Sequence, residues 1–535
     1  MDASSGSSRC PQCGFQRPTG ALVEAFDLHV SLGTRHYTLL NSNAPPDDSE
    51  TTFIRAVVSD ADARLASIDS EISKLQERLK QLEEERVLLS SYRTRNSAIL
   101  SPLRRMPSEI LCEIFSWTLP SIGEALITDH FDQTQSPWLV TRISSRWRAV
   151  SLSTPSLWSR IAIDYRQGLK GPSTYSYSLV EVQIQRAQNL KIHFYGCETA
   201  DSGVQIQIFR LLLRHSPRWE EFSLGLTSSL VPLLPAVRDR IHSLKRVFIH
   251  WFSPESQKAV QSIDCFESAC SLVDFNAYNE HRFIPIAHPT HQLRRYQLDC
   301  PWEIHKGILK LATNLVEARI VINFDDEPWP DMDEIVDLPL LRRLYVSYTA
   351  VLNYIRSPVL EEVAFWVEKG VDTFLPHLES LRDRSACSLR RICLKGFPDA
   401  YTTTEILEKH PSITELALLI ITSDASIGTN LLISTLTASQ ALGSTTVAPQ
   451  LRLLLFGCER HSSIDYTAYL EMLKSRWRAE DCALTAAVLA TEVHGPDTAT
   501  LLGLHALRRE GLNFFLAEGI EAIDETDGWG YGTTW

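Results

Sequence analysis

A six-residue frame that recurs ten times between residues 219 and 456 limits the fold more than any other feature. Each copy has an apolar residue at its first, fourth and sixth positions. Because side chains alternate between the two faces of a strand, this pattern predicts ten buried β-strands. The copies are residues 219–224, 244–249, 272–277, 293–298, 315–320, 341–346, 360–365, 389–394, 413–418 and 451–456.

The spacing of the frames indicates a repeat architecture. The first and last copies begin 232 residues apart, so the mean spacing is about 26 residues, which lies in the range of leucine-rich repeats. The intervening segments 202–214, 303–314 and 403–410 have helical composition. We therefore expect an α/β solenoid whose repeats stack to cover their apolar faces. The solenoid should be irregular, because the intervals vary from 19 to 38 residues and no asparagine recurs at a fixed place in the repeat. A non-repetitive α/β domain is the alternative.

A heptad pattern precedes the repeats. Its apolar residues follow one another in steps of three and four, with Arg86 in one expected apolar place: Leu65, Ile68, Ile72, Leu75, Leu79, Leu82 and Leu89. No glycine or proline occurs between residues 61 and 101, which predicts one long helix. The seam spans fewer than four heptads, so two interpretations stay open: a homodimer through residues 65–89, or a helix packed against its own chain.

A short apolar helix is expected directly after this long one. Pro102 ends the long helix, because proline cannot donate to the helical ladder and restricts the residue before it. Pro107 suits the first turn of a new helix, and Glu109 places a negative charge at its positive end. The helix then carries a broad apolar stripe of Ile110, Leu111, Ile114 and Phe115.

Two more short apolar elements follow. After Pro137, apolar residues recur at helical steps: Leu139, Val140, Ile143, Trp147 and Val150. Thr154 is expected to cap a third element, which starts at Pro155 and contains Leu157, Trp158 and Ile161. Three such helices predict a small bundle. A bundle of this size has little interior, so part of its apolar surface should need a partner or the adjoining domain.

These elements in this order resemble an F-box. The resemblance lies in Leu103, in Met106 to Leu111, in Ile114 and Phe115, then in Ile143, Arg146 to Arg148 and Val150, and last in Thr154, Pro155, Leu157 and Trp158. The sequence is especially similar to the F-box proteins of mushroom-forming fungi, in which a heptad helix often precedes the box and a repeat domain follows. It departs from the family in having Met106 before Pro107 instead of leucine, Ser144 where cysteine is common, and a long spacer at residues 117–137.

The resemblance implies a docking module for the Skp-type adaptor of cullin-RING ubiquitin ligases. It implies an adaptor-binding set of Leu103, Met106, Pro107, Ile110, Leu111, Ile114 and Phe115, and an F-box core of Ile143, Trp147, Val150, Leu157 and Trp158. The chain is then a non-enzymatic, SCF-type substrate receptor, which reaches a cullin through the adaptor and holds a target protein on its repeat domain. A structural scaffold built on coiled-coil pairing and the repeat surface, without a ligase role, is the alternative.

Composition and charge limit the classes of partner and the cellular compartment that we expect for this chain. The formal net charge of −13 argues against nucleic acid, since phosphate binding normally requires a basic surplus. No uncharged apolar run of about 18 residues occurs and the first residues are polar, so we expect neither a membrane span nor a secretion signal. The eleven scattered cysteines suggest reduced thiols. We expect a cytoplasmic or nuclear protein.

Few residues suggest metal or catalytic chemistry. Cys10 and Cys13 form a CxxC pair that would need His29 and His36 to complete a zinc site, a spacing that fits no common zinc pattern, so a loop with two thiols is preferred to a zinc-dependent enzyme. Phosphate-binding loops and the common hydrolase and protease motifs do not occur, and we expect no cofactor. The acidic run at residues 325–334 is interpreted as a solvated insertion.

Together these patterns predict an α+β multidomain protein. We expect a mostly disordered region at 1–52, a long helix or coiled coil at 53–100, a three-helix F-box-like bundle at 101–165, an irregular leucine-rich-repeat-like α/β solenoid at 166–480, and a cap and tail at 481–535. Helices are expected at 464–476, at the end of the solenoid, and at 497–518, and both are assigned to capping the solenoid.

Overall fold

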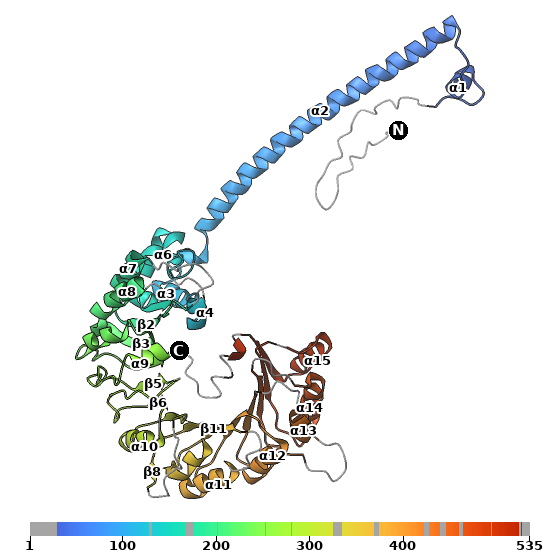
Figure 1. Cartoon of the computed structure of the whole chain (residues 1–535). Coiled ribbons are helices and arrows are strands. Elements are labelled where there is room, and N and C mark those ends of the chain that lie inside the picture. The colour runs from blue at the N-terminus through green and yellow to red at the C-terminus, as the bar shows by residue number, and fades with distance from the viewer. Residues whose placement is uncertain are drawn as a thin grey trace, which may run out of the picture. The chain divides into compact units, whose positions relative to one another are not determined.

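A computed structural model gives the fold of the chain (Figure 1). It describes residues 29–127, 131–166, 176–200, 202–251, 253–279, 281–324, 334–368, 374–421, 427–438, 446–459, 464–493, 495–519, 521–523 and 526. The chain forms two compact units, an N-terminal unit of Met1–Met106 and a C-terminal unit of Pro107–Trp535. The protein is α+β, with a long helix in the first unit and a large parallel sheet in the second.

The N-terminal unit contains a short helix α1 (Arg35–Leu40), the long helix α2 (Asp48–Ile99) and a 3-10 turn η1 (Pro102–Arg104). The predicted long helix is confirmed, and it ends just before Pro102 as expected. It begins five residues earlier than predicted because Asp47 and Glu50 form a capping box: the Asp47 carboxylate accepts from the Glu50 N–H, and the Glu50 carboxylate accepts from the Asp47 N–H. Helix α1 lies in the region expected to lack structure.

The C-terminal unit is built on one sheet of fourteen parallel strands that follow one another in chain order, consistent with a solenoid-like repeat domain (Figure 1). The strands β8 (Val336–Asp337) and β10 (Ile355–Arg356) form a separate pair. The fourteen strands are β1 (Arg160–Asp164), β2 (Leu190–Tyr195), β3 (Trp219–Leu226), β4 (Arg246–Trp251), β5 (Asp274–Tyr278), β6 (Arg295–Asp299), β7 (Glu317–Val321), β9 (Arg343–Val346), β11 (Glu362–Val367), β12 (Arg391–Gly396), β13 (Glu415–Ile420), β14 (Leu453–Cys458), β15 (Ala486–Thr491) and β16 (Asn513–Glu518).

All ten frames correspond to strands of this sheet. They are ten successive members of the strand order, from β3 to β14. The register aligns their fourth and sixth positions from strand to strand, as in the pairs Phe222 with Val247 and Leu224 with Ile249. Residues at these positions are buried and stack into continuous apolar rows, which is why the frame had to recur.

Helices connect the strands along the outer side of the curved sheet (Figure 1). The frame's fourth and sixth positions face them: the ring centroids of Phe365 and Phe374 lie 4.9 Å apart, and those of Phe456 and Tyr469 lie 5.2 Å apart. The helices are α7 (Tyr177–Arg186), α8 (Ser202–Arg214), α9 (Pro254–Lys258), α10 (Trp302–Leu311), α11 (Phe374–Ser385), α12 (Ala400–Lys409), α13 (Ile427–Leu436), α14 (Tyr466–Arg478) and α15 (Thr498–Arg509), with 3-10 turns η3 (Ser216–Arg218), η4 (Val231–Val237) and η5 (Thr349–Tyr354).

The sheet extends beyond the predicted repeat region of 166–480 at both ends. It starts with β1, inside the region assigned to the helical bundle, and it ends with β15 and β16, inside the region assigned to the cap. The helix expected over 497–518 is in fact helix α15 followed by strand β16. The chain turns between them at Gly511, whose φ of 108° is readily adopted only by glycine.

Candidate functional site

The predicted docking helix is α3 (Ser108–Trp117). Pro107 is its N-cap residue rather than its first helical residue, and Glu109 lies in the first turn. Leu111 and Phe115 are fully buried at positions i and i+4 of one helix face. Ile110, about 100° around the helix from Leu111, is 49% exposed. The broad apolar stripe is therefore divided between the interior and the surface.

The buried face of α3 packs on α6 (Ser145–Leu152). The rings of Phe115 and Trp147 lie 4.9 Å apart at an angle of 53°. The Cys112 sulfur lies 3.0 Å from the Thr154 hydroxyl, which donates to the Val150 carbonyl at 2.7 Å. Leu111 and Phe115, which the sequence predicted in the adaptor-binding set, are thus covered by the chain's own helices.

The outer face of α3 forms a stripe of Ile110, Ile114 and Trp117, at positions i, i+4 and i+7. Ile114 is half-buried, and Trp117 is 76% exposed. Trp117 was not among the predicted residues, although its spacing from Ile110 and Ile114 was a usable signal. We call these three residues the α3 stripe.

The other predicted adaptor-binding residues lie around the boundary between the two units. Leu103, in η1, is 44% exposed, and Met106 is half-buried as the last residue of the N-terminal unit. Pro107 is exposed as the first residue of the C-terminal unit.

Two short helices, α5 (Val140–Ile143) and α6, follow α3, with α4 (Ile122–Ile127) inside the long spacer. Ser144 separates α5 from α6, and its hydroxyl accepts from the Trp147 N–H at 3.1 Å as the N-cap of α6. Ser144 therefore has a structural role as a helix cap. Ile143, predicted as core, is 52% exposed, because this cap turns the chain before the next helix.

The third predicted helix is a 3-10 turn, η2 (Pro155–Trp158), that leads directly into β1. Thr154 occupies the N-cap position as predicted, but its side chain makes no capping hydrogen bond and donates to the Val150 carbonyl instead. Leu157 and Trp158 are buried as predicted, Val150 is buried and Trp147 is half-buried. The Trp158 indole N–H donates to the Ser151 carbonyl at 2.9 Å.

This helical region joins the sheet through shared aromatic residues. Trp158 meets Trp138, a buried residue that the sequence analysis missed, with ring centroids 5.0 Å apart. The guanidinium of Arg186, from α7, lies 4.3 Å from the Trp158 ring and 5.1 Å from the Trp138 ring. The helices that carry the α3 stripe are therefore anchored on the first repeats.

The inner side of the sheet carries an ion-pair ladder at the frame's third position. Acidic and basic residues alternate along successive strands, with N–O distances of 2.6 to 3.9 Å between neighbours. Opposite charges at facing positions of adjacent strands are favourable pairs. The ladder consists of Lys191, Glu221, Arg246, Asp274, Arg295, Glu317, Arg343, Glu362, Arg391 and Glu415.

Burial differs between the acids and bases of this ladder. The carboxylates are nearly covered, whereas the basic side chains remain 22 to 49% exposed. At Asp274 burial outweighs the attraction of Arg295 and Arg246 and raises the pKa to about 6. The inner face therefore presents guanidinium groups above buried carboxylates, a surface suited to protein contacts.

Aromatic residues accompany the ladder on the first strands. The Arg166 guanidinium lies 4.3 Å from the Tyr195 ring, and the rings of His250 and Tyr278 meet edge to face at 5.0 Å. Burial, assisted by Arg166, lowers the pKa of His250 to about 4, so the imidazole is neutral at physiological pH.

The inner face is apolar toward the carboxy-terminal end of the sheet. Six buried residues form one cluster there: Tyr345, Ala364, Cys393, Ala417, Leu419 and Leu455. Farther along, Ala522 packs on Ala490 and Ala517. A Cβ atom at Gly457 would lie 2.7 Å from the Thr526 methyl group. Thr526 can therefore pack on β14 because residue 457 has no side chain.

Candidate metal ligands do not gather in the part of the chain that the structure describes. No group of three or more His, Cys, Asp or Glu residues there is placed to hold a metal ion. Cys10 and Cys13 lie outside the described residues, as do residues 325–333 of the acidic run. Glu334, which is described, pairs with Lys310 at 2.5 Å.

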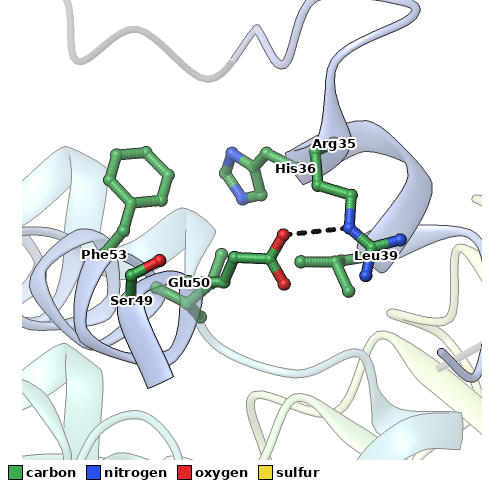
Figure 2. Close-up of a pocket in the computed structure, with 7 residues that line it drawn as sticks. Arg35, His36, Leu39, Ser49, Glu50 and Phe53 are labelled. Atoms are coloured by element: carbon green, nitrogen blue, oxygen red, sulfur yellow. Dashed lines mark hydrogen bonds and ion pairs between the residues drawn. The ribbon is translucent and has the colours of Figure 1, made fainter. Parts of the chain in front are cut away.

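A small pocket of about 300 Å³ lies between α1 and the start of α2 (Figure 2). The Arg35 Nε donates to Glu50 Oε1 at 2.9 Å, and the rings of His36 and Phe53 meet edge to face at 5.5 Å. Glu50 also completes the helix cap, so both of its carboxylate oxygens are engaged. The contacts around the pocket hold α1 against α2.

Helices with the length and apolarity needed to cross a membrane do not occur among the described residues.

Comparisons with known proteins do not show which family the chain belongs to. No family model matches the chain, and no curated protein matches it. A solved structure of a protein from Bacteroides fragilis aligns with a TM-score of 0.28 and 10% sequence identity, covering 59% of this chain and 83% of that chain. A likeness at this TM-score carries no argument about fold or partners. The function of this chain must therefore be inferred from its own residues.

Proposed function

We propose that the protein is the substrate-receptor subunit of a cullin-RING (SCF-type) ubiquitin ligase. In this proposal residues 103–158 are an F-box-like docking module, and the sheet with its outer helices is a leucine-rich-repeat-like solenoid. A Skp-type adaptor binds the module and brings the cullin, while a target protein binds the inner face of the solenoid. The protein itself catalyses nothing; it holds a target lysine near the ubiquitin-charged enzyme, so that transfer becomes effectively intramolecular.

The α3 stripe is the observation that carries this proposal. An exposed tryptophan in line with two isoleucines on one helix face is typical of a protein-binding surface. The position of the α3 stripe is fixed, because the buried Leu111 and Phe115 anchor the helix on α6. Trp117 therefore joins Ile110 and Ile114 in the adaptor-binding set, and the two buried residues leave it.

Affinity purification of the full chain from cell extract tests this function. The double variant Ile110→Ala with Trp117→Ala removes two exposed members of the stripe without opening the core. Tyr401→Ala is a matched control, because it removes a ring that is 78% exposed on α12, far along the sequence. We expect adaptor and cullin to co-purify with the wild type and with the control but not with the double variant. Their absence from the wild-type sample, or their retention by the double variant, would contradict the proposal.

A structural scaffold is the second candidate, and the exposed seam of α2 favours it. In that function α2 pairs subunits and the repeat surface binds other proteins without a ligase. Deletion of residues 60–95 separates the two candidates. The deletion should lower the molecular mass in solution in either case, but only a receptor still co-purifies with the adaptor.

A further inference from the structure

Helix α2 exposes an apolar seam along most of its length. No residue of this 52-residue helix is buried. The seam residues are between 41 and 64% exposed: Val58, Leu65, Ile68, Ile72, Leu75, Leu79, Leu82 and Leu89. A continuous apolar stripe on a helix is normally buried against another element, so this helix has a face that requires a partner.

Helix α1 sets the amino-terminal limit of the exposed seam. It packs on the first turns of α2, where Leu39 and Ile54 line the pocket between the two helices (Figure 2). Ile54 is the preceding seam position and is partly buried there. The surface open to a partner therefore begins at Val58 and ends at Leu89, a length of about 47 Å at 1.5 Å per residue.

We propose that residues 58–89 pair with the same residues of a second copy of this chain, in a parallel, in-register, two-stranded coiled coil. The seam fits the heptad positions a and d, with a at Val58, Leu65, Ile72 and Leu79 and d at Ile68, Leu75, Leu82 and Leu89. Leucine at three of these d positions and β-branched residues at two of the a positions favour two strands over three or four.

The charges beside the seam select the parallel orientation. In a parallel pair, each g residue contacts the e residue five positions later on the other helix. These contacts join Arg64 to Asp69 and Arg78 to Glu83 of the second copy, which gives four ion pairs by symmetry. The remaining charged g positions, Glu71 and Glu85, meet uncharged residues: Gln76 and Ser90. No like-charged g–e pair arises.

The antiparallel alternative is less well matched. With the apolar positions aligned, g residues meet g residues and pair favourably, but e residues meet e residues. Asp62 then lies opposite Glu83 at two symmetric places, and like charges there are destabilising.

Arg86 ends the continuous apolar seam and helps to fix its register. It occupies an a position, where in the parallel pair it faces Arg86 of the second copy next to Glu85 of that copy. A long side chain at such a position packs its stem and extends its charge toward solvent. A single charged residue at an a position lowers stability but specifies register, because any shift would place it among leucines.

Sedimentation equilibrium of the full chain at low ionic strength tests this pairing. The wild type is expected to have the mass of a dimer. The variant Arg64→Glu with Arg78→Glu places like charges at all four g–e contacts and should raise the dissociation constant about tenfold or more. Adding Asp69→Arg with Glu83→Arg restores opposite charges only in the parallel orientation, and should return the constant to within about threefold of the wild-type value.

A matched control separates pairing from a general effect of charge. Lys74→Glu with Lys80→Glu makes the same change of charge on the outward c and b positions and should leave the mass unchanged. A monomer at all concentrations, a trimer or larger assembly, or a failure of the compensating variant to restore dimers would overturn the proposal. Adaptor binding by the α3 stripe is a separate property and should persist in the charge-reversed monomer, so the two proposals fail independently.

Discussion

Neighbouring apolar residues on α3 lie in opposite environments. Ile110 is 49% exposed, whereas Leu111 is fully buried. The sequence pattern showed only that the helix has a broad apolar stripe; it did not show which side packs on α6, because that depends on the position of Trp147 in a later helix. For the same reason Ile143 was predicted as core although it is exposed, and Trp117 was missed.

Removing the buried ring of α3 should destabilise the C-terminal unit. Phe115→Ala leaves a cavity against Trp147 and should lower the free energy of unfolding by about 3 to 5 kcal/mol. Ile110→Ala on the same helix should change it by less than about 1 kcal/mol. Denaturant unfolding of both variants measures the difference, and equal losses would show that α3 packs by another face.

Buried histidines should make the repeat domain sensitive to acid. Burial lowers the pKa values of His288 and His305 to about 4, while an unfolded chain protonates histidine near pH 6.5. Below pH 6.5 the unfolded state therefore binds protons that the folded state does not. The histidine contribution to stability is complete above pH 6.5 and is lost as the pH falls toward 4. The raised pKa values of Asp274 and Asp299, about 6, act in the opposite sense below pH 6.

The variant His305→Gln isolates one histidine. His305 bonds to the Tyr296 hydroxyl at 2.9 Å and to the Val321 carbonyl at 3.0 Å. Between pH 6 and pH 4.5 the free energy of unfolding of the variant should fall less steeply than that of the wild type, by up to about 1.4 kcal/mol per pH unit. Identical slopes would mean that His305 does not remain neutral in the folded protein.

The strands show how far local pattern predicts the elements. Ten frames gave ten strands, and two further strands follow the same frame, since Trp158 and Leu484 supply the first apolar position for β1 and β15. In β2 and β16 that position is Asn189 or Gly511, so the frame is incomplete and only pairing with the neighbouring strand identifies them. The ion-pair ladder had a signal as well, an alternation of charge at the third position. This alternation predicts ion pairs only if the strands are known to be parallel and adjacent.

Glu362, a carboxylate of the ladder, should contribute far more to the free energy of unfolding than its sequence neighbour Glu361. Glu362 is 3% exposed and lies within 3.3 Å of Arg343, Arg390 and Arg391. Glu362→Gln removes the charge that compensates these guanidinium groups and should cost about 3 kcal/mol of stability. Glu361→Gln is the control, because Glu361 is 43% exposed and pairs with the exposed Arg342. It should cost less than about 1 kcal/mol.

At the scale of the whole molecule, the proposals assign one role to each part. Helix α2 pairs two copies, the α3 stripe binds the adaptor, and the inner face of the sheet receives the target. In a parallel dimer the two copies of α2 end at the same end of the coiled coil. Residues 100 to 106 of both chains therefore begin there, and each continues into its own C-terminal unit. Two receptors joined in this way would bind a repetitive target with higher avidity than one.

The binding of the purified full chain to a purified Skp-type adaptor tests the central claim most directly. Titration calorimetry should show a one-to-one complex for the wild type and for Tyr401→Ala. The Ile110→Ala and Trp117→Ala double variant should bind at least about thirtyfold more weakly, the loss expected from removing about 2 kcal/mol of contact energy. Equal affinity for all three proteins, or no heat of binding with the wild type, would contradict the assignment of α3 as the docking helix.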